Sequence, residues 1–380
     1  RVVGGLAAPL FLLTAGAALG LGALRGRTVA RAAERGFGLV ALGFLLQLER
    51  WAVDRGALAD AGAWPALLFG LLAGAAFLVA TTPPLRRRPV VARVPTPAWI
   101  ALAVALLLAH VACVAAFDAR CLATTLRFDV LHCIGISTVI CALAVPARPR
   151  REALSVAILA AAAIAIALVT PAVARALGDA PALAWIARAR ELRSIAPFPV
   201  LPWCGYAVAG CALARAVAWA ASSRRAARVL SAPALAAIAV LASIVAAVAF
   251  EGGLAWTRHA LSVLPDARIL SRLVFHLGVA TALACACGLL ARSRRLGVVR
   301  DLGRASLAIY VLHVPLAYGA MAEPFDRSLS PSACAVAAIA LVAACAVGAT
   351  MAARARSRRA GGEDAHMLAG SPSFEGNLRA

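Results

Sequence analysis

Eleven apolar segments, each bounded by charged residues or proline, run almost from one end of the sequence to the other. A transmembrane helix needs about 20 apolar residues, and most of the segments come close to that length. Hydrophobic residues make up 63% of the 380 residues and charged residues only 14%, which is more apolar surface than a soluble fold can bury. The sequence therefore predicts an all-α, polytopic integral membrane helix bundle with about 11 transmembrane helices, at approximately residues 3–24, 36–53, 62–80, 97–117, 127–146, 153–173, 199–220, 232–250, 269–291, 304–322 and 331–353.

Arginine is distributed unevenly among the loops, and this pattern predicts the orientation. Every second loop carries a dense Arg cluster, whereas the intervening loops are mixed or acidic. Because cytoplasmic loops carry an excess of basic residues, we expect the clusters to face the cytoplasm and residue 1 to lie outside. One more helix upstream of Arg1 would return the N-terminus to the cytoplasm, and we expect such a helix. The clusters occupy residues 25–35, 86–93, 148–151, 224–228, 292–300 and 354–359.

The net charge of +21 comes largely from these clusters. We expect no nucleic-acid partner, because the basic residues form short groups between apolar runs and no continuous basic surface. The sequence predicts a transmembrane domain at residues 1–354 and a disordered, polar cytoplasmic tail at residues 355–380. Most of the ten Cys residues lie inside apolar runs, so we expect small buried side chains and no metal site. Whether Cys121 pairs with Cys204 stays open.

Ionisable side chains inside the predicted spans lie mostly in the outer half of the bilayer. Such groups are costly in lipid, so each is a candidate for function. Asp129 and His132 are three residues apart, share a helix face, and lie near the outer end of their span, beside Arg127. His276 lies in the outer half of its span, and His313 lies near mid-depth. This grouping predicts a polar cavity that opens toward the outer surface.

Histidine suits proton transfer near neutral pH, and an Asp on the same face can orient the ring and keep it basic. We expect Arg127 and Arg50 to bind substrate at the outer end of the site. Two simpler interpretations remain open: Arg127 and Asp129 form only an interfacial ion pair, and His110 is a satisfied residue between helices. The candidate catalytic residues are His313, His276, Asp129 and His132.

Other functional classes are weighed against the same pattern. A small-solute transporter or a non-catalytic membrane protein is the main alternative, although the sequence has no inverted repeat and no pair of short, broken helices. Haem binding is disfavoured, because the embedded His residues do not form pairs at the spacing that two facing helices would need.

Four segments of the sequence resemble the heparan-α-glucosaminide N-acetyltransferase-like family. The resemblance extends over nearly the whole chain in order and spacing, and the fourth segment is similar to a helix found more widely in membrane acyltransferases. The segments are residues 5–16 (GLAAPLFLLTAG), 127–137 (RFDVLHCIGIS), 198–206 (FPVLPWCGY, followed by Gly210) and 306–315 (SLAIYVLHVP).

The resemblance implies that an acyl group, with acetyl the expected one, moves from cytoplasmic acyl-CoA to a sugar, glycan or other acceptor at the outer face. Acyl-CoA would be a co-substrate, and no cofactor would be bound permanently. The family's catalytic His lies just upstream of the segment at residues 5–16. Trp203 and Tyr206 are candidates to stack on a sugar ring, or equally are aromatics of the membrane interface. We expect the protein in the lipid bilayer of a bacterial inner membrane.

Overall fold

The chain is entirely helical in the residues that its computed structural model describes. These are residues 2–54, 56–86, 88–118, 127–144, 152–178, 183–187, 196–222, 231–259, 267–290, 303, 305–318, 330, 332–348 and 350–351. All regular elements within these ranges are helices, which confirms the all-α prediction. Cys121 and the predicted tail at residues 355–380 lie outside the described residues.

Each of the eleven predicted spans falls on a helix. Seven of the described helices are long and apolar enough to cross a membrane, so the chain is an integral membrane protein, and the count of about 11 crossings stays a prediction. Four short helices lie in loops: η1 Ala57–Ala59, η2 Ala61–Ala63, α4 Pro83–Arg86 and α5 Pro89–Ala92. The long elements are α1 Val2–Leu24, α2 Val29–Asp54, α3 Trp64–Thr81, α6 Thr96–Asp118, α8 Val130–Ala144, α9 Glu152–Leu177, α10 Val200–Ser222, α12 Ala232–His259, α13 Ala267–Leu290, α15 Ser306–Tyr318 and the apolar helix Ser332–Gly348.

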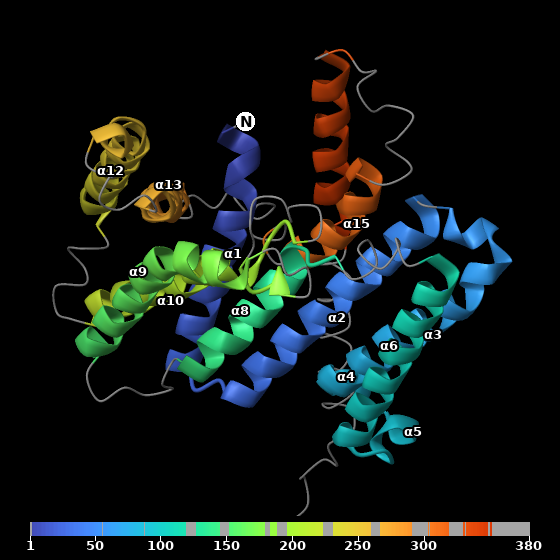
Figure 1. The fold of residues 1–380 in the computed structure, drawn as a ribbon. Helices are drawn as coiled ribbons and strands as arrows, with labels where there is room; N and C mark the ends of the chain where they lie inside the picture. The colour runs from blue at the N-terminus through green and yellow to red at the C-terminus, as the bar shows by residue number, and fades with distance from the viewer. Residues whose placement is uncertain are drawn as a thin grey trace, which may run out of the picture. The chain divides into compact units, whose positions relative to one another are not determined.

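The chain divides into two compact units, Arg1–Leu289 and Leu290–Ala380. The first unit contains α1 to α13, and the second contains α15 and Ser332–Gly348. Within the first unit, α1 packs on α10, α2 packs on α8, α3 packs on α6, and α9 packs on α10 (Figure 1). Helix α2 also contacts α3, and α8 contacts α10. Helices α2, α8 and α10 are therefore consecutive neighbours.

Glycine lets two of these helix pairs approach closely. A Cβ atom at Gly36 of α2 would lie 2.6 Å from the Gly135 carbonyl oxygen, and one at Gly135 of α8 would lie 2.5 Å from that of Gly36. Between α1 and α10, a Cβ atom at Gly16 would meet the backbone of Ala207, and one at Gly210 would meet the Leu13 carbonyl. Small residues at helix contacts are common in membranes, where van der Waals packing drives association.

His110 of α6 is a packing residue in the contact between α2, α3 and α6. It is fully buried, and its Nδ1–H donates to the Ala66 carbonyl oxygen at 2.8 Å. The rings of Phe44 and Trp51 on α2 meet its ring edge to face. This geometry favours the interpretation of His110 as a packed residue between helices, with Nδ1 bonded and the buried Nε2 without a hydrogen-bond partner among the described residues.

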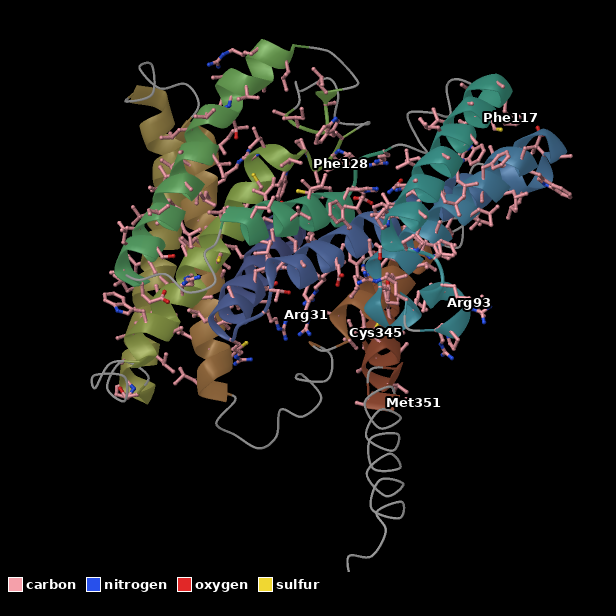
Figure 2. All side chains as sticks on the ribbon, turned by 90° about the horizontal axis from the view of Figure 1, so that it is seen from below. Arg31, Arg93, Phe117, Phe128, Cys345 and Met351 are labelled. Atoms are coloured by element: carbon pink, nitrogen blue, oxygen red, sulfur yellow. The ribbon has the colours of Figure 1, made fainter. Side chains whose placement is uncertain are left out.

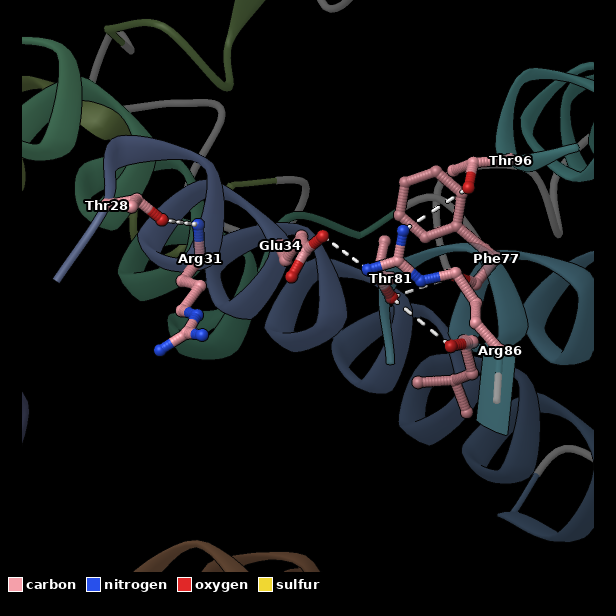
Figure 3. A network of polar contacts seen from close by, with 8 residues as sticks. Thr28, Arg31, Glu34, Phe77, Thr81, Arg86 and Thr96 are labelled. Atoms are coloured by element: carbon pink, nitrogen blue, oxygen red, sulfur yellow. Dashed lines mark hydrogen bonds and ion pairs between the residues drawn. The ribbon is translucent and has the colours of Figure 1, made fainter. Parts of the chain in front are cut away.

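An ion pair links three elements on the side of the predicted cytoplasmic clusters. Arg86 of α4 pairs with Glu34 of α2 and donates to the Thr96 hydroxyl at the start of α6 at 3.3 Å (Figure 3). Its guanidinium therefore fastens the loop between α3 and α6 to α2.

A second ion pair joins α9 to α10. Arg215 of α10 is fully buried, and its Nη2 lies 3.1 Å from each carboxylate oxygen of Glu152 at the start of α9. Sequence reasoning missed Arg215 as an embedded charge. Its partner is 63 residues away, and only the packing of α9 on α10 brings the two together.

Candidate functional site

Asp129 forms the start of α8. Its Oδ1 atom accepts a hydrogen bond from the Val130 N–H at 2.6 Å, and its own N–H donates to Nδ1 of His132 at 3.3 Å. This reciprocal pattern is similar to a capping box, in which a residue three positions into the helix binds the backbone of the capping residue. The predicted span began at Arg127, but the helix begins at Val130 because Asp129 acts as its cap.

Gln47 ties this cap to the neighbouring helix. Its Nε2 atom donates to Oδ2 of Asp129 at 3.0 Å, and the side chain is only 2% exposed. Both carboxylate oxygens of Asp129 therefore have donors, one from α8 and one from α2. Gly43 lies one turn before Gln47, and a Cβ atom there would approach Nδ1 of His132 to 2.9 Å. The absence of a side chain at Gly43 gives the imidazole its place against α2.

Two arginines give the site a positive character. Arg127 is half-buried and lies just before the cap. Burial lowers the pKa of Arg127 and the nearby Arg50 lowers it further, whereas Asp129 raises it. The buried Nε of Arg127 and the buried Oε1 of Gln47 have no hydrogen-bond partner among the described residues. The site therefore holds one unused donor and one unused acceptor, as a ligand with both hydroxyl and carbonyl groups would require.

Aromatic rings line the His132 side of the site. The Phe128 ring, labelled in Figure 2, is centred 5.4 Å from the His132 ring and 6.2 Å from the Trp185 ring. Trp185 is 41% exposed and belongs to a single turn at residues 183–187. This turn lies in the loop between α9 and α10, which the Arg pattern predicts to be external.

The turn is fixed to α10 through its backbone. The N–H groups of Val200 and Leu201 donate to the carbonyl oxygens of Trp185 and Ile186, both at 2.7 Å. Leu201 has non-helical backbone angles, so these two N–H groups precede the regular part of α10, and the turn supplies their acceptors. Trp185 is thereby held beside Phe128.

A second polar group lies between α10 and α13. The Tyr206 hydroxyl and Nδ1 of His276 are 2.9 Å apart, and the Trp203 ring is centred 5.6 Å from the Tyr206 ring. Tyr206 is 4% exposed, so its ring is inside the helix contact, whereas Trp203 is half-buried. On α13, Arg272 is exposed one turn from His276.

Helix α8, which carries the first group, contacts α10, which carries part of the second. The thiol of Cys133 on α8 donates to the Pro199 carbonyl oxygen at 3.8 Å, directly before α10. The structure thus brings Arg127, Asp129 and His132 together with Gln47, and it brings Trp203 and Tyr206 together with His276. His313 belongs to the second unit, where its Nδ1–H donates to the Ile309 carbonyl oxygen at 3.0 Å. The roles predicted for all these residues stay predictions.

Three residues of the site escaped sequence reasoning as binding groups. Gln47 had a signal, because an amide in the apolar α2 lies on the same helix face as Gly43. Phe128 lies inside the segment at residues 127–137 but was not singled out. For Trp185 the only sequence signal was its position in an apolar stretch of a loop. Within the described residues, no group of three or more His, Cys, Asp or Glu side chains is placed to hold a metal ion.

Comparison with known families matches residues 50–248, just over half of the chain, to the family described as heparan-alpha-glucosaminide N-acetyltransferase, catalytic. No curated protein and no solved structure matches the chain. The matched residues include Arg50, the Asp129–His132 cap and Tyr206. His276 and His313 lie beyond the match.

Proposed function

The chain belongs to the family of heparan-alpha-glucosaminide N-acetyltransferase catalytic domains, and from this we propose that it is a membrane-bound acyltransferase. It moves an acyl group, acetyl in the first instance, from cytoplasmic acyl-CoA to a sugar or other acceptor at the outer face. The membrane is the inner membrane of a bacterium. Acyl-CoA is a co-substrate in this proposal, not a bound cofactor.

One observation supports the location of the reaction most directly. Asp129 and His132 lie within the matched residues, and Asp129 is hydrogen-bonded to Gln47 at the end of α2 that the Arg pattern assigns to the outer face. Polar groups in lipid need partners, and among the described residues the Nε donor of Arg127 and the Oε1 acceptor of Gln47 have none, so both are left for a ligand.

The proposed roles follow from this chemistry. In acyl transfer the thioester C–S bond breaks, a C–O or C–N bond forms to the acceptor, and the acceptor proton passes through a base to the CoA thiolate. A base must remove that proton, and donors must stabilise the carbonyl oxygen as it gains negative charge. Arg127 and Arg50 bind substrate oxygens. Asp129, His132, His276 and His313 are the catalytic candidates.

The aromatic residues fit a sugar acceptor. Trp185 is exposed beside the site and Trp203 is half-buried, so both can offer part of a ring face. Tyr206 is nearly fully buried and meets His276, so in this proposal it contributes by orienting that imidazole and not by stacking.

The test uses the full chain, purified and reconstituted in lipid nanodiscs. Radiolabelled acetyl-CoA is supplied with glucosamine, glucose or glycerol, and labelled product is measured. We expect transfer to a sugar by the wild-type chain and its loss in Asp129→Asn, with His110→Gln as the control outside the site. Failure to transfer acetyl or longer acyl groups to any acceptor, together with sugar uptake into proteoliposomes, would support the transporter alternative.

A further inference from the structure

We infer that His132 acts in the outer site as a hydrogen-bond donor to a substrate oxygen through its Nε2–H, and not as the general base. This assignment rests on the proposed acyl transfer. It changes the role that the sequence pattern favours, in which Asp129 keeps the ring basic.

The backbone N–H of Asp129 determines the tautomer. A neutral imidazole carries one proton, so one ring nitrogen donates and the other accepts. An amide N–H can only donate, and that of Asp129 points to Nδ1 at 3.3 Å. Nδ1 therefore carries the lone pair, and the proton is on Nε2. An imidazolium carries a proton on both nitrogens, so Nδ1 could no longer accept this bond.

The Asp129 carboxylate does not provide the opposite arrangement. Its Oδ1 atom accepts from the Val130 N–H and its Oδ2 atom accepts from Gln47. The bond between Asp129 and His132 runs from the backbone and not from the carboxylate. The arrangement in which a carboxylate accepts from one ring nitrogen and leaves the other as a base is therefore not the one formed here.

The accepting nitrogen is also enclosed. Nδ1 lies against α2, where a Cβ atom at Gly43 would approach it to 2.9 Å, and it is occupied by the cap of α8. A substrate proton cannot reach it without opening that cap.

Nε2 is at the other end of the ring and is available to a ligand. Within the described residues it makes no hydrogen bond, and the His132 side chain is only partly buried. Phe128 covers one part of the ring, and the unused Nε of Arg127 belongs to the same group of residues. Two N–H donors in a site of low polarity suit a carbonyl oxygen that becomes negative in the transition state. The thioester carbonyl of acyl-CoA is such an oxygen.

Two substitutions separate the two ends of the imidazole. In His132→Gln the amide nitrogen lies near the position of Nε2 and keeps a donor there, but the cap loses its acceptor. In His132→Asn the amide oxygen lies near the position of Nδ1 and keeps the cap, but the distal donor is lost. Each variant therefore keeps one function of the imidazole and loses the other: His132→Gln keeps the distal donor, and His132→Asn keeps the acceptor of the cap.

The experiment measures acetyl transfer from acetyl-CoA and the thermal midpoint for both variants in nanodiscs. We expect His132→Asn to lower kcat about 100-fold, as loss of one oxyanion donor does, with a nearly unchanged midpoint. We expect His132→Gln to lose less than about tenfold while its midpoint falls. Equal inactivity of the two variants would indicate a base and overturn the assignment, as would full activity of both.

Nitrogen NMR of the full chain labelled with ¹⁵N-histidine gives a readout that does not depend on turnover. The His132 signals are assigned by their loss in His132→Gln, and we expect a protonated Nε2 and an unprotonated Nδ1 near neutral pH. A protonated Nδ1 in an active enzyme overturns this assignment alone. If the wild-type chain transfers no acyl group, the proposed function fails and the donor role fails with it.

Discussion

Gln47 of α2 donates to the Asp129 carboxylate, and this bond of 3.0 Å joins residues 82 positions apart in the sequence. It fastens the start of α8 to the C-terminal part of α2. The residue that caps α8 also lies within the matched family segment. The integrity of the site and the pairing of α2 with α8 depend on the same contact.

Replacement of Gln47 by Leu should weaken both. The Oδ2 atom of Asp129 would lose its donor, and a buried polar atom without a partner costs about 1–3 kcal/mol. We expect a lower thermal midpoint in nanodiscs and a loss of acetyl transfer. Leu48→Met changes the adjacent residue of α2 without removing a hydrogen bond and serves as the control. An unchanged midpoint for Gln47→Leu would mean that the bond does not hold the helices together.

Gly135→Ala should destabilise the contact of α2 with α8. The new methyl group would lie 2.5 Å from the Gly36 carbonyl oxygen, and overpacking of this kind costs about 1–3 kcal/mol. Gly348→Ala is the matched control, because nothing lies within 4 Å of a Cβ atom at Gly348. We expect the thermal midpoint to fall for Gly135→Ala only. Equal midpoints for the two variants would contradict the close approach of the helices.

A double-mutant cycle should detect the coupling between Glu152 and Arg215. Removing one member of a buried pair costs about 3–5 kcal/mol, and we expect less here because Glu152 keeps 28% of its side-chain surface exposed. Glu152→Gln should lower the thermal midpoint, and Arg215→Met in the same chain should restore part of it. Additive effects of the two substitutions would show that the residues are not coupled.

Labelling tests the orientation. Arg93 is exposed directly after α5, and Ala61 is exposed in η2. The two residues lie at opposite ends of α3. An impermeant thiol reagent applied to intact cells should modify Ala61→Cys, whereas Arg93→Cys should react only after the cells are opened. The parent chain provides the background from its native Cys residues. The reverse pattern would place the Asp129 site in the cytoplasm and refute an external acceptor.

Trp185→Ala should weaken acceptor binding more than acyl-CoA binding. An aromatic contact contributes about 0.5–1.5 kcal/mol, so the KM for a sugar acceptor should rise about two- to tenfold. Trp219→Ala removes a tryptophan of similar exposure on α10 and serves as the control. A KM for acetyl-CoA that rises instead would assign Trp185 to the donor substrate.

The helices could be predicted because each membrane span must satisfy its own backbone hydrogen bonds, so the length of an apolar run is enough to locate it. The polar pairs were harder to predict from the sequence. Asp129 and His132 are close in sequence and their proximity was predictable, but their bond runs through the backbone, which a helix face alone does not reveal. Gln47 and Arg215 meet partners 82 and 63 residues away, and only the order in which the helices pack decides such pairs.

The backbone bonds of the turn at residues 183–187 link the position of Trp185 to the start of α10. Displacement of this turn would remove the acceptors of the Val200 and Leu201 N–H groups. The start of α10 would then lose the contacts that fix it to Trp185 and Ile186. Tyr206 lies little more than one turn further along α10 and meets His276. The position of Trp185 and the contact between Tyr206 and His276 therefore depend on the same short segment at the start of α10.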